Sequence, residues 1–258
     1  MQKRSLGSTA IEVSRIGLGT VKFGRNQGVK YPDAFELPDD KTVRELLSLA
    51  ASLGMNLLDT APAYGTSEER LGKALQGERQ AWVIVSKVGE ECVNGESRFD
   101  FSASTVRESV QRSLRRLKTD YLDVVLVHSS GEDEQIIEKT DVFATLAALK
   151  QAGWIRAYGM STKTVAGGLL TLDHADVAMV TLNAAHTSER VVIQRAAELK
   201  KGILIKKALA SGHLHDLPGA HQAAAALQFV LAEPGVTSVM VGTLNPAHLR
   251  QNALLLAE

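Results

Sequence analysis

The sequence predicts an α/β protein folded as a (β/α)8 TIM barrel, and three observations carry this prediction. Short apolar runs alternate with segments of helical spacing along the whole chain, a pattern typical of a parallel sheet covered by helices. Eight such pairs occur, which is the number that a closed barrel of this kind needs. The length of 258 residues is also close to the usual barrel length of about 250 residues. We therefore expect residues 1–258 to form a single barrel domain.

The predicted elements follow one another in a regular order. A hairpin over residues 2–16 is expected to close the amino-terminal end of the barrel, and a long polar loop is expected at 23–38. The predicted strands cover residues 16–20, 55–59, 81–87, 122–128, 155–160, 177–182, 203–209 and 238–241. The predicted helices cover residues 40–53, 67–75, 104–117, 141–151, 164–172, 188–200 and 220–232, and a last one begins near Pro246.

A doubly wound sheet with a glycine fingerprint for dinucleotides is the alternative fold. The candidate fingerprint is Gly17-Leu-Gly19-Thr-Val-Lys22, directly after the first predicted strand. It lacks the third glycine, and no helical pattern opens immediately after it. The sequence therefore disfavours a Rossmann domain.

The composition indicates a globular protein without a nucleic-acid or membrane partner. Hydrophobic residues make up 45% of the chain, and 29 basic residues balance 29 acidic ones, so no excess charge would attract such a partner. The single cysteine, Cys92, excludes an internal disulfide and fits a reducing compartment, and we interpret it as an incidental loop residue. The amino-terminal residues lack an apolar secretory core, and no apolar run reaches membrane-spanning length. We expect a cytoplasmic protein.

Polar side chains stand at the ends of three predicted strands. Asp59, Lys87 and His128 end the second, third and fourth strands, and Tyr64 follows Asp59 in a proline-containing turn. Taken singly, each has a structural interpretation, as a turn cap, a solvated lysine, a core histidine or a loop anchor. Active sites of barrels lie at the carboxyl ends of the strands, so the fold would place all four on one rim. We interpret them together as a catalytic site.

These four side chains suit the protonation of an oxygen atom. A free tyrosine has a pKa near 10, and a nearby ammonium lowers that pKa by favouring the phenolate. A carboxylate beside the lysine would keep it charged, and an imidazole can hold a carbonyl oxygen or pass a proton. The set therefore fits carbonyl reduction, provided that another group delivers hydride.

Other common chemistries find no support in the sequence. Gly159-Met-Ser161-Thr-Lys163 is not the G-x-S-x-G nucleophile elbow, and no P-loop motif occurs. No tyrosine is followed four residues later by lysine, which a short-chain dehydrogenase would need. His213 and His215 lack a third ligand nearby, so we predict no metal site.

The motifs together resemble the aldo-keto reductase family, and the resemblance runs over essentially the whole chain. Asp59-Thr-Ala-Pro-Ala-Tyr64-Gly65 resembles the family's D-T-A-x-x-Y-G element. Val85-Ser-Lys87 and Leu126-Val-His128 resemble its lysine and histidine strands. The resemblance implies a barrel that binds a nicotinamide cofactor without a Rossmann fold. It also implies Tyr64 as general acid/base, tuned by Asp59 and Lys87, with His128 orienting the carbonyl.

The resemblance also assigns cofactor positions, several of which depart from the family pattern. Gly159-Met-Ser161-Thr162 resembles G-x-S-N, but Thr162 replaces the asparagine that usually holds the carboxamide. Met179 replaces a glutamine with the same task, and a thioether cannot supply those hydrogen bonds. Lys206 replaces a tyrosine that stacks on nicotinamide in many relatives. The implied cofactor positions are Gly19, Thr20, Ser161, Thr162, Met179, Lys206, Lys207, Leu209, Thr243, Asn245, His248, Gln251 and Asn252.

Within this set, the residues near the last helix decide the expected cofactor. Thr243, Asn245 and His248 would meet a 2′-phosphate, and Gln251-Asn252 would lie near adenine, so the resemblance implies NADPH, with NADH as the other candidate. A helix start assists phosphate binding without a lysine. The basic residues often found at this position in the family are fewer here.

The leading hypothesis is an NADPH-dependent aldehyde or ketone reductase, monomeric or weakly oligomeric, that acts on a small carbonyl substrate. The alternative is a nicotinamide-cofactor-binding regulatory or sensor protein with poor turnover, which the missing carboxamide groups favour. The chain stops after the last predicted helix, and the loop at 210–219 is short. We therefore expect an open site with loosely held cofactor and broad specificity, unless the loop at 23–38 or at 90–102 closes it.

Overall fold

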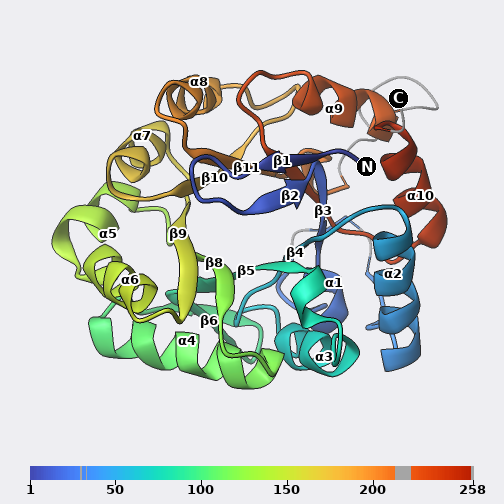
Figure 1. The fold of residues 1–258 in the computed structure, drawn as a ribbon, viewed down its shortest axis with the longest axis horizontal. Coiled ribbons are helices and arrows are strands. Elements are labelled where there is room, and N and C mark those ends of the chain that lie inside the picture. The colour runs from blue at the N-terminus through green and yellow to red at the C-terminus, as the bar shows by residue number, and fades with distance from the viewer. Residues whose placement is uncertain (30, 33, 213–221, 257–258) are drawn as a thin grey trace.

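Eight parallel strands form a closed barrel in the computed structural model, which describes residues 1–29, 31–32, 34–212 and 222–256 (Figure 1). The order around the barrel is β10-β11-β12-β3-β4-β5-β8-β9, so neighbours in the chain are neighbours in space. The strands are β3 (Ile16–Gly19), β4 (Leu57–Asp59), β5 (Val83–Val88), β8 (Leu122–His128), β9 (Ile155–Ser161), β10 (Val177–Thr181), β11 (Gly202–Lys206) and β12 (Ser238–Val241). The predicted fold class is confirmed.

Helices surround the barrel, as Figure 1 shows. They are α1 (Val21–Gly24), α2 (Asp40–Ser52), α3 (Ser67–Ala74), α4 (Ala103–Leu117), α5 (Asp133–Lys139), α6 (Val142–Gln151), α7 (Val165–His174), α8 (Arg190–Glu198), α9 (Gln222–Leu231) and α10 (Pro246–Leu254). Helix α2 shows why such segments form: the Asp39 side chain caps it by accepting from Thr42 N, and its buried residues recur at helical spacing. Gly54 follows with φ +80°, a conformation that ends the helix.

Alternation along the strands divides the core into two layers. In β5, Val83 and Val85 point into the barrel, whereas Ile84 belongs to the layer between strands and helices. The inner layer also contains Leu6 from the amino-terminal hairpin, β1 (Lys3–Ser5) and β2 (Glu12–Ser14). Leu6 packs over Gly202 at the start of β11, where a side chain would collide with it. The hairpin therefore closes the amino-terminal end of the barrel, as expected.

A second hairpin replaces the loop expected at 90–102. It consists of β6 (Glu90–Val93) and β7 (Glu96–Phe99), which pair antiparallel. Asn94 and Gly95 form its turn with φ +53° and +84°, as a tight hairpin turn requires. Cys92 thus lies in a strand and is half-buried, rather than in a loop. The Asn-Gly pair is a sequence signal that could have predicted this hairpin.

The remaining differences are local. Short helices α1 and α5 occupy stretches expected to be loops. Strand β11 ends at Lys206 instead of Leu209, because Lys207 has φ +56° and turns the chain out of the sheet. The start of the predicted helix at 220–232 lies outside the described residues. Within the described ranges, no helix is long and apolar enough to cross a membrane.

Candidate active site

An ion pair between neighbouring strands forms the base of the site. Asp59 ends β4 and Lys87 lies in β5, both on the inward-facing side of the barrel. Lys87 Nζ is 2.5 Å from Asp59 Oδ1 and donates to Thr60 O at 2.9 Å. Both side chains are buried, at 1% and 8% exposure, so each charge depends on the other for compensation.

The turn after β4 places Tyr64 over this ion pair. Lys87 Nζ lies 4.7 Å from the centre of the Tyr64 ring, in a cation–π contact. Burial, followed by the negative charge of Asp59, raises the pKa of Tyr64 well above 10. The expectation of a lowered pKa is therefore not met, because burial and the Asp59 carboxylate both disfavour the charged phenolate. Tyr64 is a stable phenol, able to donate a proton.

His128 completes the group predicted from the sequence. It ends β8, and its ring meets that of Tyr64 edge-on, with centroids 6.2 Å apart and planes at 83°. Burial lowers the pKa of His128 below its ordinary value, and the charges of Lys87 and Lys206 act in the same direction. The structure thus brings Asp59, Tyr64, Lys87 and His128 together at the carboxyl end of the barrel strands.

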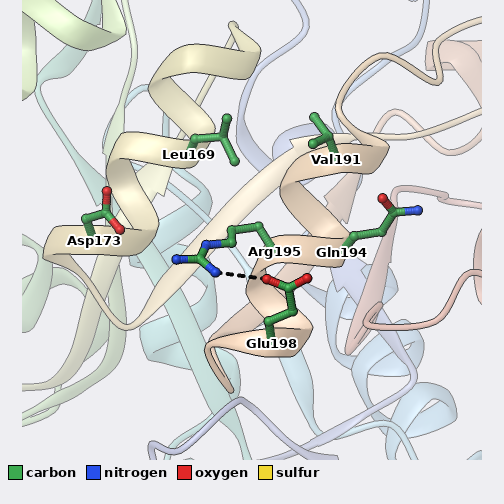
Figure 2. A pocket seen from close by; sticks show the side chains of 6 residues that line it. All are labelled: Leu169, Asp173, Val191, Gln194, Arg195 and Glu198. Atoms are coloured by element: carbon green, nitrogen blue, oxygen red, sulfur yellow. Dashed lines mark hydrogen bonds and ion pairs between the residues drawn. The ribbon is translucent and has the colours of Figure 1, made fainter.

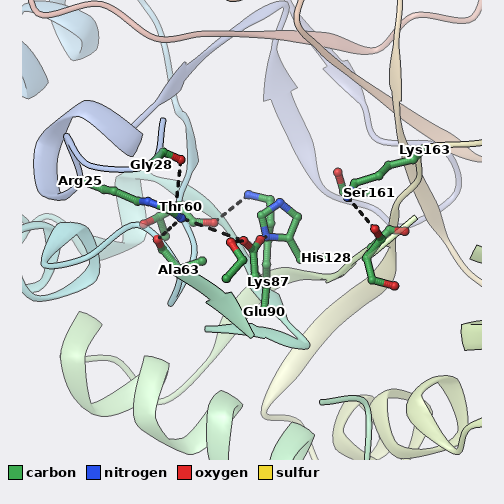
Figure 3. Close-up of polar contacts among 12 residues, drawn as sticks. Arg25, Gly28, Thr60, Ala63, Lys87, Glu90, His128, Ser161 and Lys163 are labelled. Atoms are coloured by element: carbon green, nitrogen blue, oxygen red, sulfur yellow. Dashed lines mark hydrogen bonds and ion pairs between the residues drawn. The ribbon is translucent and has the colours of Figure 1, made fainter. Parts of the chain in front are cut away.

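Glu90 is a member of this group that sequence reasoning missed. It is the first residue of β6, and its Oε2 lies 2.6 Å from His128 Nδ1. Ser97 donates to its other oxygen, and Arg25 Nη1 approaches that oxygen at 4.0 Å. Arg25 also donates to Ala63 O at 3.1 Å, so it connects Glu90 with the Tyr64 turn (Figure 3). The hairpin signal at Asn94-Gly95 could have placed Glu90 beside the Lys87 strand end.

The rim formed by β9, β10 and β11 contains a second polar group. Lys206 Nζ crosses from the end of β11 to β9, where it donates to Ser161 Oγ at 2.9 Å and to Thr162 O. Burial lowers the pKa of Lys206 to about 7, partly opposed by the negative charge of Glu189. Glu189 Oε1 accepts from Thr181 N at 3.1 Å, at the end of β10. Among the described residues, the buried atoms Glu189 Oε2 and Thr162 Oγ1 have no hydrogen-bond partner.

Other predicted cofactor residues have varied surroundings. Thr20 is fully buried, and its hydroxyl donates to Asp59 O, so it holds the turn after β4. Met179 lies in the inner core layer, and Leu209 packs against the outer one. Gly19 lies beside Gly242, and a Cβ added at Gly19 would be 3.7 Å from Gly242 Cα.

The residues near the last helix divide by exposure. Asn245 caps α10 by accepting from Ala247 N, and Thr243 Oγ1 accepts from Asn245 N. Lys207, His248 and Gln251 are exposed, whereas Asn252 is 5% exposed. Asn252 therefore lies on the inner side of α10, away from the surface that Gln251 presents.

Comparison with known proteins agrees with this geometry. The model of the aldo/keto reductase family matches residues 15–214, more than half of the chain. The chain belongs to the aldo/keto reductase family. It is 30% identical to L-galactose dehydrogenase from Arabidopsis thaliana, over 100% of this chain and 89% of that protein. A crystal structure of a Pseudomonas aeruginosa protein assigned to the aldo-keto reductases is 55% identical, with a TM-score of 0.89, covering 98% of this chain and 93% of that one. The holo form of an aldo-keto reductase from Bacillus halodurans is 26% identical, with a TM-score of 0.85, covering 100% and 91%.

Membership of this family makes the protein an NAD(P)H-dependent oxidoreductase that reduces carbonyl groups. The predicted resemblance is confirmed. The functions of individual site residues follow from their chemistry and remain proposals.

Two loops meet at the mouth of this aldo-keto reductase site. Gly28 lies against Gly95 of the β6–β7 hairpin, so closely that a Cβ at Gly28 would be 2.5 Å from Gly95 O. Tyr31, in the same loop as Gly28, approaches Gly242, and Lys22 Nζ lies 4.3 Å from the centre of the Tyr31 ring. The described residues of the loop at 23–38 thus contact the hairpin, and closure of the site by either segment stays a prediction. Much of the loop at 210–219 lies outside the described residues.

Hollows on the outer surface are separate from this site. A groove of about 340 Å³ runs between α7 and α8, lined by Leu169, Asp173, Val191, Gln194, Arg195 and Glu198 (Figure 2). None of the predicted site residues lines it. The described ranges contain no cluster of three or more metal-ligating side chains, and His213 and His215 lie outside them.

Proposed function

We propose that this aldo-keto reductase uses NADPH to reduce small aldehydes or ketones to alcohols, with Tyr64 as the proton donor. The supporting observation is the arrangement of Tyr64 over the buried Asp59–Lys87 pair, with His128 at its edge. Because the pKa of Tyr64 is raised well above 10, its hydroxyl carries a proton at any physiological pH.

Each side chain then has a definite task. A bound nicotinamide cofactor would supply the hydride for the carbonyl carbon. Tyr64 donates its proton to the oxygen as negative charge develops there, and the Lys87 ammonium stabilises the phenolate that remains. Asp59 keeps Lys87 charged and in place, through the 2.5 Å contact. His128 orients the substrate oxygen opposite Tyr64.

The group around Lys206 fits the nicotinamide end of the cofactor. A carboxamide offers one acceptor and two donors, and this rim offers matching atoms. Lys206 and Ser161 can donate to its oxygen, while Glu189 Oε2 and Thr162 Oγ1, unpartnered among the described residues, can accept from its nitrogen. These residues would replace the asparagine and glutamine that are missing. Near α10, Thr243, Asn245 and His248 would hold the 2′-phosphate, which favours NADPH over NADH.

The alternative, a cofactor-binding regulatory or sensor protein, is less well supported. It was motivated by the missing carboxamide ligands, and the Lys206 group supplies substitutes for them. A small carbonyl partner, a monomeric or weakly oligomeric state and a cytoplasmic location stay predictions.

A carbonyl panel tests the proposal directly. We expect the NADPH absorbance band to fall when aldehydes are added, with a slower rate for NADH at equal concentration. Tyr64→Phe should bind NADPH, measured by fluorescence quenching, and reduce almost nothing. Tight cofactor binding without turnover for any carbonyl would instead favour the regulatory alternative.

A further inference from the structure

The guanidinium of Arg25 lies between the Tyr64 turn and the β6–β7 hairpin. It makes three hydrogen bonds to carbonyl oxygens, which belong to Ala63 at 3.1 Å, Gly28 at 3.1 Å and Gln27 at 2.9 Å. Figure 3 shows this one side chain reaching both Ala63 and Gly28. The Arg25 side chain is only 11% exposed, so these hydrogen bonds are largely shielded from water.

The hydrogen bond to Ala63 fixes the peptide unit directly before the proposed proton donor. The N–H of that peptide belongs to Tyr64 and donates to Ala61 O at 3.0 Å, while its carbonyl oxygen accepts from Arg25. Both ends of the peptide are therefore held within the chain. Because the Tyr64 side chain is long, even a small tilt of this peptide would be amplified at the phenolic oxygen.

The same guanidinium faces a buried carboxylate. Arg25 Nη1 lies 4.0 Å from Glu90 Oε1, and the Glu90 side chain is also 11% exposed. Burial opposes ionisation of Glu90, but His128, Ser97 and Arg25 outweigh it and lower its pKa to about 2. Glu90 Oε2 in turn lies 2.6 Å from His128 Nδ1. Arg25 thus contacts both the turn that carries Tyr64 and the carboxylate beside His128.

Backbone packing holds the main chain of Arg25 in place without help from its side chain. Helix α1 ends at Gly24, whose carbonyl oxygen accepts from Thr66 N at 3.4 Å. A Cβ added at Gly24 would be 2.3 Å from Tyr64 O, so a glycine is needed for this close approach. Substitution of the Arg25 side chain should therefore leave this packing intact.

We propose that Arg25 is a positioning residue for the proton transfer, whose guanidinium fixes the peptide before Tyr64 and the carboxylate beside His128 and so holds the two sides of the catalytic group at a constant separation. The inference rests on the proposed function, in which Tyr64 donates the proton and His128 orients the carbonyl. Arg25 acts through Ala63 and Glu90. An arginine suits this task because its planar fork donates in several fixed directions at once, whereas a lysine ammonium is a point charge on a flexible stem.

Kinetics of Arg25 variants test this role. In Arg25→Met, kcat for an aldehyde should fall about 10–100-fold, because a displacement of about 1 Å can cost that much. KM and the Kd of NADPH should stay within about threefold, since the ground-state contacts to substrate and cofactor remain. Arg25→Lys should lose less kcat, because its ammonium still compensates Glu90 but cannot make three directed hydrogen bonds. Full kcat in Arg25→Met would overturn the proposal.

Arg79 offers a matched control at the opposite end of the barrel. Its side chain is 12% exposed and, like that of Arg25, donates to backbone carbonyls, here of Trp82 and Tyr121. It also pairs with a buried carboxylate, that of Asp123. Arg79→Met should lower the thermal unfolding midpoint at least as much as Arg25→Met and yet retain kcat. An equal loss of kcat in both variants would overturn the proposal, because loss of any buried arginine would then slow turnover.

Selective labelling reports the hold on the peptide without any turnover. Two of the four tyrosines, Tyr64 and Tyr158, follow an alanine, so carbon-13 in alanine carbonyls and nitrogen-15 in tyrosine amides give two linked NMR signals. The signal missing in Tyr64→Phe is that of Ala63–Tyr64. It should shift in Arg25→Met, because its carbonyl loses a charged donor, whereas the Ala157–Tyr158 signal from β9 should not move. An unmoved Ala63–Tyr64 signal would overturn the proposal.

These measurements distinguish failure of this inference from failure of the proposed function. If the wild-type chain reduces no carbonyl while the Ala63–Tyr64 signal shifts in Arg25→Met, the proposed function fails and the hold of Arg25 on the peptide stands. If the wild type reduces carbonyls through Tyr64 and Arg25→Met keeps its kcat, the role of Arg25 alone fails.

Discussion

The two halves of the active-site rim differ in how their polar groups are satisfied. At the ends of β4, β5 and β8, the charges of Asp59, Lys87 and Glu90 all have ion-pair partners within the chain, although His128 Nδ1, 2.6 Å from Glu90 Oε2, makes no well-directed hydrogen bond within the described residues. At the ends of β9, β10 and β11, Thr162 Oγ1 and Glu189 Oε2 remain unpartnered within the described residues. The half at β4, β5 and β8 is therefore held in place by contacts within the chain before a ligand binds. The half at β9, β10 and β11, which we call the cofactor half, has buried polar atoms that a ligand could satisfy. This contrast suits a rigid proton-donating group beside a cofactor-binding one.

The largest expected effect on activity comes from removing the proposed proton donor, Tyr64. Tyr64→Phe keeps the ring over Lys87 but removes the hydroxyl, so kcat should fall about 10²–10⁴-fold. NADPH affinity should stay within about twofold. Tyr121→Phe, which changes a tyrosine packed on Arg79, is the control and should retain full activity. Substantial kcat in Tyr64→Phe would show that another group donates the proton.

Breaking the buried ion pair should lower stability as well as activity. Lys87→Met leaves the Asp59 carboxylate buried without its partner, so the free energy of unfolding should fall by about 3–5 kcal/mol in denaturant titrations. The double variant Asp59→Asn/Lys87→Met should recover much of that loss, since no isolated charge remains. Lys150→Met at the more exposed Lys150–Asp176 pair should cost at most about 1 kcal/mol. Equal losses of unfolding free energy in Lys87→Met and Lys150→Met would contradict the claim that burial makes the Asp59–Lys87 pair more important for stability.

The cofactor half should respond to pH through Lys206. Because its pKa is lowered to about 7, Lys206 is an ammonium below that pH and loses its charge above it. Affinity for the anionic cofactor should therefore decrease as pH rises from 6 to 8, by up to about tenfold in a fluorescence titration. Lys206→Met should bind weakly at both values. Lys201→Met is the control, because its ammonium binds Ala175 O at the opposite end of β11. An unchanged pH dependence in Lys206→Met would assign the effect to another group.

The smallest effect expected is on acid stability. The pKa of Glu90 is lowered from 4.5 to about 2, so its ionised form stabilises the fold above the unfolded pKa. That contribution is lost as pH falls from about 4.5 toward 2. Glu90→Gln should therefore flatten the decline of the unfolding free energy in this window, while Glu91→Gln should not. If the unfolding free energy of both variants declined equally with falling pH, Glu90 would not contribute to acid stability in this way.

The sequence alone determined the barrel and four members of the site. Apolar runs ending in Asp59, Lys87 and His128 indicated strands whose ends meet, because parallel strands in a barrel share one active rim. Tyr64 follows Asp59 in a proline-containing turn, which indicated that it lies on the same rim. These are local signals, carried by residues within a few positions of a strand end.

Only the tertiary structure decided how these groups interact. Glu90 reaches His128 from a hairpin 38 positions earlier in the chain, and Lys206 reaches Ser161 across an intervening strand. The direction of the Tyr64 pKa shift also reversed the sequence-based expectation. Its causes are burial first and then the negative charge of Asp59. Solvation and side-chain contacts between distant segments leave no periodic pattern in a sequence, so they become visible only when the chain is folded.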